Sequence, residues 1–189
     1  FYAWGPASCE VYQNVGSMPF PLARSSVIQV GIYARWAIAG YEPGFNDDQV
    51  FIASDGTVRR LVGYDPQVIS TKDLDRLIQA VVDRESLRLT AYVFDGTKMI
   101  SVSCPNWTWE YNMSTGFWHE RKTFNQDRWF GVNAINYNDR WLFTRGDAAR
   151  LLWIDSTSQT DDGLSISMTL QSAPMKNFPY RSRVDAVFL

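Results

Sequence analysis

The clearest alternation of apolar and polar positions begins at Leu87, in the segment LRLTAYVF. Every second residue over positions 87–93 is apolar, which is the period of a β-strand. The dipeptide Asp95-Gly96 follows, and it is the strongest short signal for a hairpin turn. The chain continues through MISVSC, a turn at residues 104–106, the alternating WTWEY, the turn NMSTG and FWHER. We therefore predict a meander of four antiparallel strands over about 87–121.

The same order of strands and turns occurs on both sides of this meander. VIQVGIYARWAIA, QVFIA, TVRRLV and QVIS predict four strands over about 27–70, and WFGVNAIN, WLFT, ARLLWI and LSISMTLQS predict four over about 129–172. The turn before each third strand contains Gly56, Asn106 or Asp147, so the units repeat every ~40–50 residues, which is typical of β-propeller blades. We predict an all-β, β-propeller-like fold of four-stranded antiparallel blades, with a two-sheet sandwich as the alternative.

One segment has the period of a helix instead. The segment covers residues 71–83. Ser70 or Thr71 can cap a helix at its start, and the first turn carries acidic residues. We predict one amphipathic helix inserted between the first two blades, packed on the outside of the propeller or across a blade junction. Its apolar face consists of Leu74, Leu77, Ile78, Val81 and Val82.

Three blade-like units are too few to close a propeller, which generally needs four to eight. The last residues, RVDAVFL, alternate like the first strand of a further unit, and the chain opens on Phe1 instead of Met. We therefore expect residues 1–189 to be a single propeller-like region of a longer chain.

Composition narrows the classes of protein further. Apolar residues make up 46% of the chain and charged residues 20%, which is the composition of a folded protein. The net charge of -2 leaves no broad basic surface for nucleic acid. The longest apolar run, residues 27–40, is too short to span a membrane and contains Arg35.

Few residues could carry catalysis or bind a metal. The only cysteines, Cys9 and Cys104, lack the spacing of a zinc site, and we expect buried, reduced thiols. The only histidine, His119, lies on a predicted strand, and we expect it to bond the turn at residues 114–116. No G-x-S-x-G nucleophile motif occurs in the sequence.

Two acidic pairs, Asp47-Asp48 and Asp161-Asp162, could supply the acid and base of a glycoside hydrolase or bind calcium. Neighbouring Asp side chains diverge on an extended backbone, however, and Asp-Asp-Gly is ordinary turn chemistry. We predict no catalytic residue, no cofactor-binding residue and no metal ligand, hence no enzyme and no cofactor. A glycoside hydrolase remains the less favoured alternative.

The stretch WTWEYNMSTGFWHER is unusually rich in aromatic residues. Strand alternation places Trp107, Trp109 and Tyr111 on one face, and we expect packing between blades to bury that face. A carbohydrate-binding propeller, which would expose aromatic rings to sugars, is the alternative. The tripeptide Arg145-Gly146-Asp147 is expected to be a hairpin turn and not an adhesion motif.

Three segments resemble a family of known proteins. They are VFIASDGTVRRLVGYDPQVIST with the helix after it, WTWEYNMSTGFWHER, and TDDGLSISMTLQSAP. They are similar to elements of the phage packaged-DNA stabilisation proteins, which are the tail hub, or nozzle, proteins of short-tailed bacteriophages. The resemblance covers about residues 50–189, and residues 1–49 carry no segment that we match to the family.

The resemblance implies a structural protein of the virion tail, assembled in the cytoplasm of the bacterial host. Such a protein lies below the portal and adaptor, closes the DNA channel, retains the packaged genome and opens for ejection. The implied partners are other copies of itself in a ring, portal or adaptor and tail proteins, and DNA that passes without sequence-specific contacts; no membrane is implied.

The slightly acidic chain fits a channel that does not grip phosphates, because such contacts would slow the passage of DNA. We expect Arg59, Arg181 and Arg183 to face protein neighbours instead of DNA.

Overall fold

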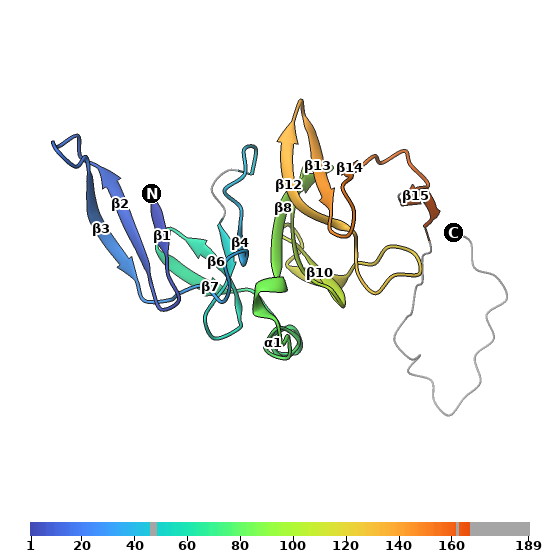
Figure 1. The fold of residues 1–189 in the computed structure, drawn as a ribbon, viewed down its shortest axis with the longest axis horizontal. Coiled ribbons are helices and arrows are strands. Elements are labelled where there is room, and N and C mark those ends of the chain that lie inside the picture. The colour runs from blue at the N-terminus through green and yellow to red at the C-terminus, as the bar shows by residue number, and fades with distance from the viewer. Residues whose placement is uncertain (46–48, 162, 167–189) are drawn as a thin grey trace.

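The computed structural model describes residues 1–45, 49–161 and 163–166. Figure 1 shows antiparallel sheets that follow one another in chain order, with a single α-helix between the second and the third. The first sheet contains β1 (Tyr2–Trp4), β2 (Cys9–Asn14) and β3 (Leu22–Ile28), and the second contains β4 (Ile38–Ala39), β5 (Val50–Ile52), β6 (Val58–Val62) and β7 (Asp65–Val68).

The helix α1 (Lys72–Gln79) and a short 3-10 helix, η1 (Arg84–Ser86), lead into the third sheet. That sheet contains β8 (Arg88–Phe94), β9 (Thr97–Cys104), β10 (Trp107–Asn112) and β11 (Phe117–Glu120). The fourth contains β12 (Gly131–Tyr137), β13 (Arg140–Arg145) and β14 (Leu151–Trp153), and a small hairpin of β15 (Thr160–Asp161) and β16 (Leu164–Ser165) follows. The prediction of an all-β, antiparallel fold with one α-helix is confirmed for the described residues.

The predicted turn chemistry is present at the hairpins. Asp95 and Gly96 have φ of 47° and 72°, and Phe94 pairs with Thr97, so a two-residue turn with both residues left-handed joins β8 to β9. The three turns used to align the units each join the second strand of a sheet to its third, in the second, third and fourth sheets.

The first strands of three consecutive sheets lie beside one another. β4 lies against β8, and the backbone N–H of Leu89 donates to the carbonyl of Trp36 at 3.0 Å. β8 lies against β12, and the N–H of Asn133 donates to the Thr90 hydroxyl at 3.1 Å. Sheets whose first strands converge in this way are arranged as the blades of a propeller are around their axis.

The prediction of one continuous strand over residues 27–39 is wrong. Val27 and Ile28 end β3 of the first sheet, and residues 29–37 form irregular backbone with one isolated bridge between Ile32 and Ala53. The reason lies at Gly31, whose backbone packs directly on the turn at Pro6. Because this contact leaves no room for a side chain, the apolar run is divided between two sheets.

Gly31→Ala is expected to lower the free energy of unfolding by about 1–3 kcal/mol or more, the usual cost of overpacking. The added methyl would meet backbone atoms of Pro6 and Ala7, which cannot rotate away. Urea unfolding measures the loss. Gly146→Ala is the control, because there the new methyl meets only the flexible Arg128 side chain at 3.1 Å, and an equal loss in both variants would contradict the explanation.

The fourth sheet has three strands among the described residues, where four were expected. Leu164 and Ser165 of the expected fourth strand form β16, which pairs with β15 and not with β14. Ile166 is described and follows the end of β16, while the last residues of that predicted strand, 167–172, and the predicted strand RVDAVFL at 183–189 lie outside the described residues.

In the part of the chain that the structure describes, two apolar cores hold the sheets together. The main core joins α1 with residues of the second, third and fourth sheets. A second, smaller core packs the first sheet on the second through Cys9, Val11, Ile28, Phe51, Ala53 and Leu61. Cys9 and Cys104 are both free and buried, as predicted, and burial raises the pKa of the Cys9 thiol to about 11.

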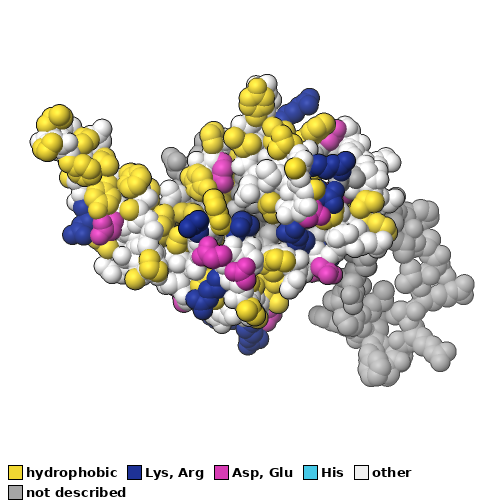
Figure 2. Space-filling model, viewed as in Figure 1, with side chains coloured by type: hydrophobic (Ala, Val, Ile, Leu, Met, Phe, Trp, Pro, Cys, Tyr) yellow, Lys and Arg dark blue, Asp and Glu magenta, His cyan; other side chains and the backbone are white. Residues whose placement is uncertain are grey.

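The hairpin of β2 and β3 extends beyond the second core. Figure 1 shows it at the left, projecting away from the other sheets, and Figure 2 shows apolar side chains gathered over its end. The large exposed apolar residues there are Val15, Met18 and Phe20.

Candidate functional site

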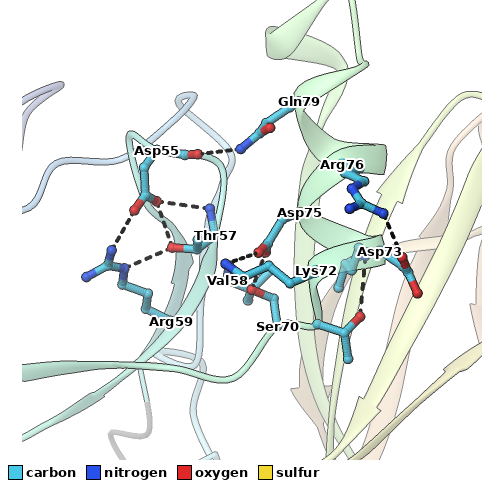
Figure 3. A network of polar contacts seen from close by, with 12 residues as sticks. Asp55, Thr57, Val58, Arg59, Ser70, Lys72, Asp73, Asp75, Arg76 and Gln79 are labelled. Atoms are coloured by element: carbon cyan, nitrogen blue, oxygen red, sulfur yellow. Dashed lines mark hydrogen bonds and ion pairs between the residues drawn. The ribbon is translucent and has the colours of Figure 1, made fainter.

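The junction between the second and third sheets is organised around a buried carboxylate on α1 (Figure 3). Asp75 is 5% exposed, and its Oδ1 accepts a hydrogen bond from the Ser70 hydroxyl at 2.5 Å. The same hydroxyl oxygen accepts from the backbone N–H of Val58 at 3.0 Å. Ser70 therefore links the helix to β6 through its hydroxyl group.

A second contact holds the other end of the helix. The Gln79 amide donates to the backbone carbonyl of Asp55 at 2.9 Å, in the turn between β5 and β6 (Figure 3). Burial alone would raise the pKa of the Asp55 carboxyl, but hydrogen bonds from Thr57 and Arg59 outweigh burial and lower it. The turn that the sequence placed at residues 54–56 is therefore also a docking point for α1.

Arg59 has an ion-pair partner within its own sheet. Its guanidinium donates to the Asp55 carboxylate at 2.6 Å, and its side chain is 20% exposed. Arg59 is thus paired within its own chain, with the turn that precedes β6, and its contact with a neighbouring protein stays a prediction.

The helix buries a narrower face than the sequence predicted. Leu74 and Ile78 are 2% and 0% exposed and belong to the main core, whereas Leu77 is 36% exposed. Val82 is fully exposed, because α1 ends at Gln79 and the chain has turned away. Thr71 caps the helix by accepting from the N–H of Leu74. The helix lies across the blade junction, which is one of its two predicted positions.

The junction between the third and fourth sheets contains a buried charge. Glu110 on β10 is 1% exposed, and its carboxylate accepts hydrogen bonds from three side chains. These are His119 Nε2 at 2.8 Å, Arg121 Nη1 at 3.0 Å from both oxygens, and the Tyr92 hydroxyl. Arg121 also donates to the Tyr92 hydroxyl oxygen at 2.6 Å. We call these four residues the Glu110 cluster.

Aromatic rings enclose the Glu110 cluster on the side of the fourth sheet. The Arg121 guanidinium lies 4.1 Å from the centre of the Trp129 ring, in a cation–π contact. Tyr92 and Trp129 both pack against Phe143 of β13, with ring centres 5.0 and 5.1 Å apart. Polar and aromatic contacts therefore join the third and fourth sheets at the same place.

One prediction for the aromatic stretch holds in part and the other is wrong. Trp107, Trp109 and Tyr111 share a face and pack against the main core, as predicted, but they are only partly buried, whereas Thr108 and Glu110 on the other face are buried. His119 bonds Glu110 and not the turn at residues 114–116, because Glu110 and His119 are direct partners in the register of β10 and β11. Asn112 holds the turn, accepting from the N–H groups of Ser114 and Thr115.

The stability contribution of Glu110 is expected to depend on pH. Burial alone would raise the pKa of its carboxyl, but the hydrogen bond from His119, the charge of Arg121 and the Tyr92 hydroxyl hold it below the ordinary 4.5. A carboxylate whose pKa is lower in the folded than in the unfolded protein stabilises the fold at pH values above its unfolded pKa. That stabilisation is lost as the pH falls through the folded pKa.

The difference in unfolding free energy between the wild type and Glu110→Gln should therefore be full at neutral pH and shrink as the pH falls below the ordinary value of 4.5. Urea titrations of both proteins across that range measure it. A difference that stays constant with pH would contradict this assignment.

An open cleft of about 860 Å³ lies beside the Glu110 cluster. Its described lining comes from the segment after β11, from β13 and β14, and from the β15–β16 hairpin, and includes the charged residues Arg121, Lys122, Arg150, Asp155 and Asp161. Hydrogen bonds from Thr157 lower the pKa of Asp155, so that carboxylate stays ionised. Glu110 itself is buried and fully bonded, so it does not reach a molecule in the cleft.

The other candidate residues are dispersed. Asp161 lies in β15, while Asp47, Asp48, Asp162, Arg181 and Arg183 lie outside the described residues.

The tripeptide at 145–147 forms a turn, as predicted, closed by a 2.6 Å ion pair between Arg145 and Asp147. Across residues 1–45, 49–161 and 163–166, no three His, Cys, Asp or Glu side chains are grouped to hold a metal. No helix in the described part of the chain has the length and apolar character to cross a membrane.

The sequence reasoning missed the Glu110 cluster. Its members lie on three strands or strand ends and meet only through the pairing of β8, β9, β10 and β11. One signal was available, because Glu110, His119 and Arg121 flank a short turn at distances that antiparallel pairing brings together.

Comparison with known families shows which family the chain matches. The family model described as Phage_stabilise, Bacteriophage P22 Gp10, beta-propeller, matches residues 1–159. The match includes all four sheets, and also residues 1–49, for which the sequence alone indicated no relative. Its description confirms the prediction of a β-propeller. No individually curated protein matched the chain.

Proposed function

This chain belongs to the phage stabilisation family of the bacteriophage P22 Gp10 β-propeller, and from that membership we propose that it is a hub, or nozzle, subunit of a short phage tail. Membership makes it a structural phage protein of the tail and DNA-stabilisation class, a component of the virion that assembles with other virion proteins. The proposal adds that it closes the DNA channel below the portal and adaptor, retains the packaged genome and opens for ejection.

The observation that carries the proposal is the family match over residues 1–159 on a chain of successive, laterally packed sheets. A channel wall under internal pressure must not bend at its joints. Both described joints from the second to the fourth sheet combine apolar packing with buried, hydrogen-bonded carboxylates, Asp75 in one and Glu110 in the other. Such networks oppose the sliding of one sheet against the next, because each hydrogen bond requires a particular geometry.

We propose that the protein has no enzymatic activity. The buried carboxylate with the most partners, Glu110, is occupied by His119, Arg121 and Tyr92, and His119 is the only histidine of the chain. General acid–base chemistry needs a group that can reach its substrate. This arrangement favours a structural use of these residues.

The proposed site of action is the virion tail, after assembly in the host cytoplasm, with further copies of the chain in a ring around the channel. Identical subunits joined head to tail close into a ring when their rotation allows it. Portal or adaptor proteins and other tail proteins would contact the ends of that ring.

Binding to duplex DNA is expected to be weak and independent of sequence, because the chain carries a net charge of -2. Titration of labelled duplex at several salt concentrations measures it, with Arg181→Ala, Arg183→Ala protein as the comparison. Tight binding with a steep salt dependence that the double variant loses would contradict the proposed orientation of the charges.

The function itself is tested in the phage. Particles made without this protein should package DNA and then lose it, so the genome becomes sensitive to added nuclease, and supplying the protein should restore retention. Particles that retain DNA normally but fail to adsorb to cells would favour the carbohydrate-binding alternative instead.

A further inference from the structure

The end of the β2–β3 hairpin, residues 14–21, is an exposed apolar protrusion, here named the hairpin tip. Val15, Met18 and Phe20 are 56%, 89% and 62% exposed. No Asp, Glu, Lys or Arg occurs between Glu10 and Arg24, so the tip and the strand ends below it are uncharged. Exposed apolar groups gathered on one protruding segment are typical of a contact surface.

Some polar groups of the hairpin tip are hydrogen-bonded within the tip. The N–H of Val15 donates to the carbonyl of Pro21 at 2.8 Å, and the Ser17 hydroxyl donates to the carbonyl of Phe20 at 2.9 Å. The N–H of Gly16 donates to the Asn14 side chain at 3.0 Å, and the two prolines carry no N–H. These bonds lower the cost of moving the tip into an apolar pocket, because the donors that take part in them stay bonded.

The chain also carries a pocket of matching chemistry. A cavity of about 300 Å³, here named the inner-strand pocket, lies where β4, β8 and β12 converge. Trp36, Ile38, Tyr41, Leu89 and Ile135 form much of its wall, and Glu42 is the one ionisable group among the described lining residues other than Tyr41. Trp36, Tyr41 and Ile135 are 48%, 62% and 54% exposed, so the wall is open to a partner.

Charge distinguishes this pocket from the larger cleft beside the Glu110 cluster. The cleft presents five charged side chains, whose desolvation by an uncharged apolar tip would be unfavourable. In the inner-strand pocket, the Glu42 carboxylate already accepts from the N–H of Gly40 at 2.6 Å. An uncharged, internally bonded tip is therefore complementary to the inner-strand pocket and not to the cleft.

We propose that the hairpin tip of one copy docks into the inner-strand pocket of a second copy of this chain. The tip and the pocket lie on different parts of the molecule, so the contact joins two different surfaces, head to tail. Each copy supplies a tip to one neighbour and a pocket to another. This inference rests on the proposed function, since it supplies the contact between neighbouring subunits of the ring.

Cross-linking of single-cysteine additions tests the contact directly. Met18→Cys protein, which keeps Phe20, and Ile135→Cys protein, mixed under mild oxidation, should form a disulfide-linked dimer at least about tenfold faster than a mixture of Met18→Cys with Val82→Cys, because docking raises the effective concentration of the two thiols. Val82 is the matched control because it is fully exposed and does not line the pocket. The native thiols of Cys9 and Cys104 are buried and should not interfere.

Sedimentation gives a second measurement on the full chain. Phe20→Asp should weaken self-association about thirtyfold or more, as expected when a central apolar anchor is lost, while Val82→Asp should not. Circular dichroism should show that both variants remain folded, since both positions are exposed.

Equal cross-linking with the Val82→Cys control, or unchanged association of Phe20→Asp, would overturn the proposal. Wild-type binding to phosphatidylethanolamine–phosphatidylglycerol vesicles that Phe20→Asp loses would assign the tip to lipid and also overturn it. In none of these cases is the proposed function lost, because genome retention in the phage is measured separately.

Discussion

Replacing Arg121 with Met is expected to lower the free energy of unfolding by about 3–5 kcal/mol, the usual cost of removing one partner from a buried ion pair. Glu110 would remain 1% exposed and would lose the one partner in the cluster that carries a permanent charge. Met keeps much of the apolar stem, so the loss reports the charge and not the volume. Urea unfolding followed by tryptophan fluorescence measures it.

Two comparisons make this prediction specific to the buried charge. Adding Glu110→Gln to Arg121→Met should recover part of the loss, because the carboxylate that lacks a partner is then gone. Arg24→Met removes an ion pair with Glu10 whose side chains are 57% and 36% exposed, and it should cost below about 1 kcal/mol. A double variant less stable than Arg121→Met alone would refute the explanation.

Ile78→Ala in α1 is expected to cost about 2–5 kcal/mol, the range for removing a fully buried aliphatic side chain. Ile78 is 0% exposed and lies in the main core between the second and third sheets. The cavity would open where α1 joins the two sheets, so both sheets should be destabilised together. Denaturant unfolding with helix and tryptophan signals recorded in parallel measures the loss.

Leu77→Ala is the matched control for Ile78→Ala. It lies on the same helix one residue earlier, is 36% exposed, and should cost under about 1 kcal/mol. Equal losses at the two positions would mean that the helix is stabilised by its own propensity and not by its place in the junction.

Local signals in the sequence were sufficient for the strands and turns of the third sheet. Alternation and the Asp95-Gly96 turn determine pairing between neighbours in the chain, and this information is contained within a few residues. The position of α1 in the chain could also be predicted, because Thr71 and the acidic first turn mark its start.

Which face of a strand is buried could not be predicted from the sequence in the same way. Alternation shows that residues 107, 109 and 111 share one face of β10, but in stacked sheets both faces have neighbours. Glu110 is buried because His119, Arg121 and Tyr92 satisfy it, and these partners come from other strands. Apolar character alone pointed to the aromatic face as the core, so the burial of Glu110 on the other face was not predicted.

The boundary between the first and second sheets depended on a backbone contact. Gly31 meets the turn at Pro6, which is 25 positions earlier in the sequence. No periodicity within residues 27–39 records such an approach. The continuous apolar run therefore looked like one strand, although the contact divides it.

The separation of the two cores divides the molecule into parts that need not unfold together. The first sheet is attached to the second through a small core to which each contributes three buried residues, so the first sheet can be released while the main core stays intact. One native thiol lies on each side of this division, Cys9 in the second core and Cys104 in the main core. The order in which the two thiols become reactive therefore distinguishes the release of one sheet from the loss of the whole fold, without any introduced label.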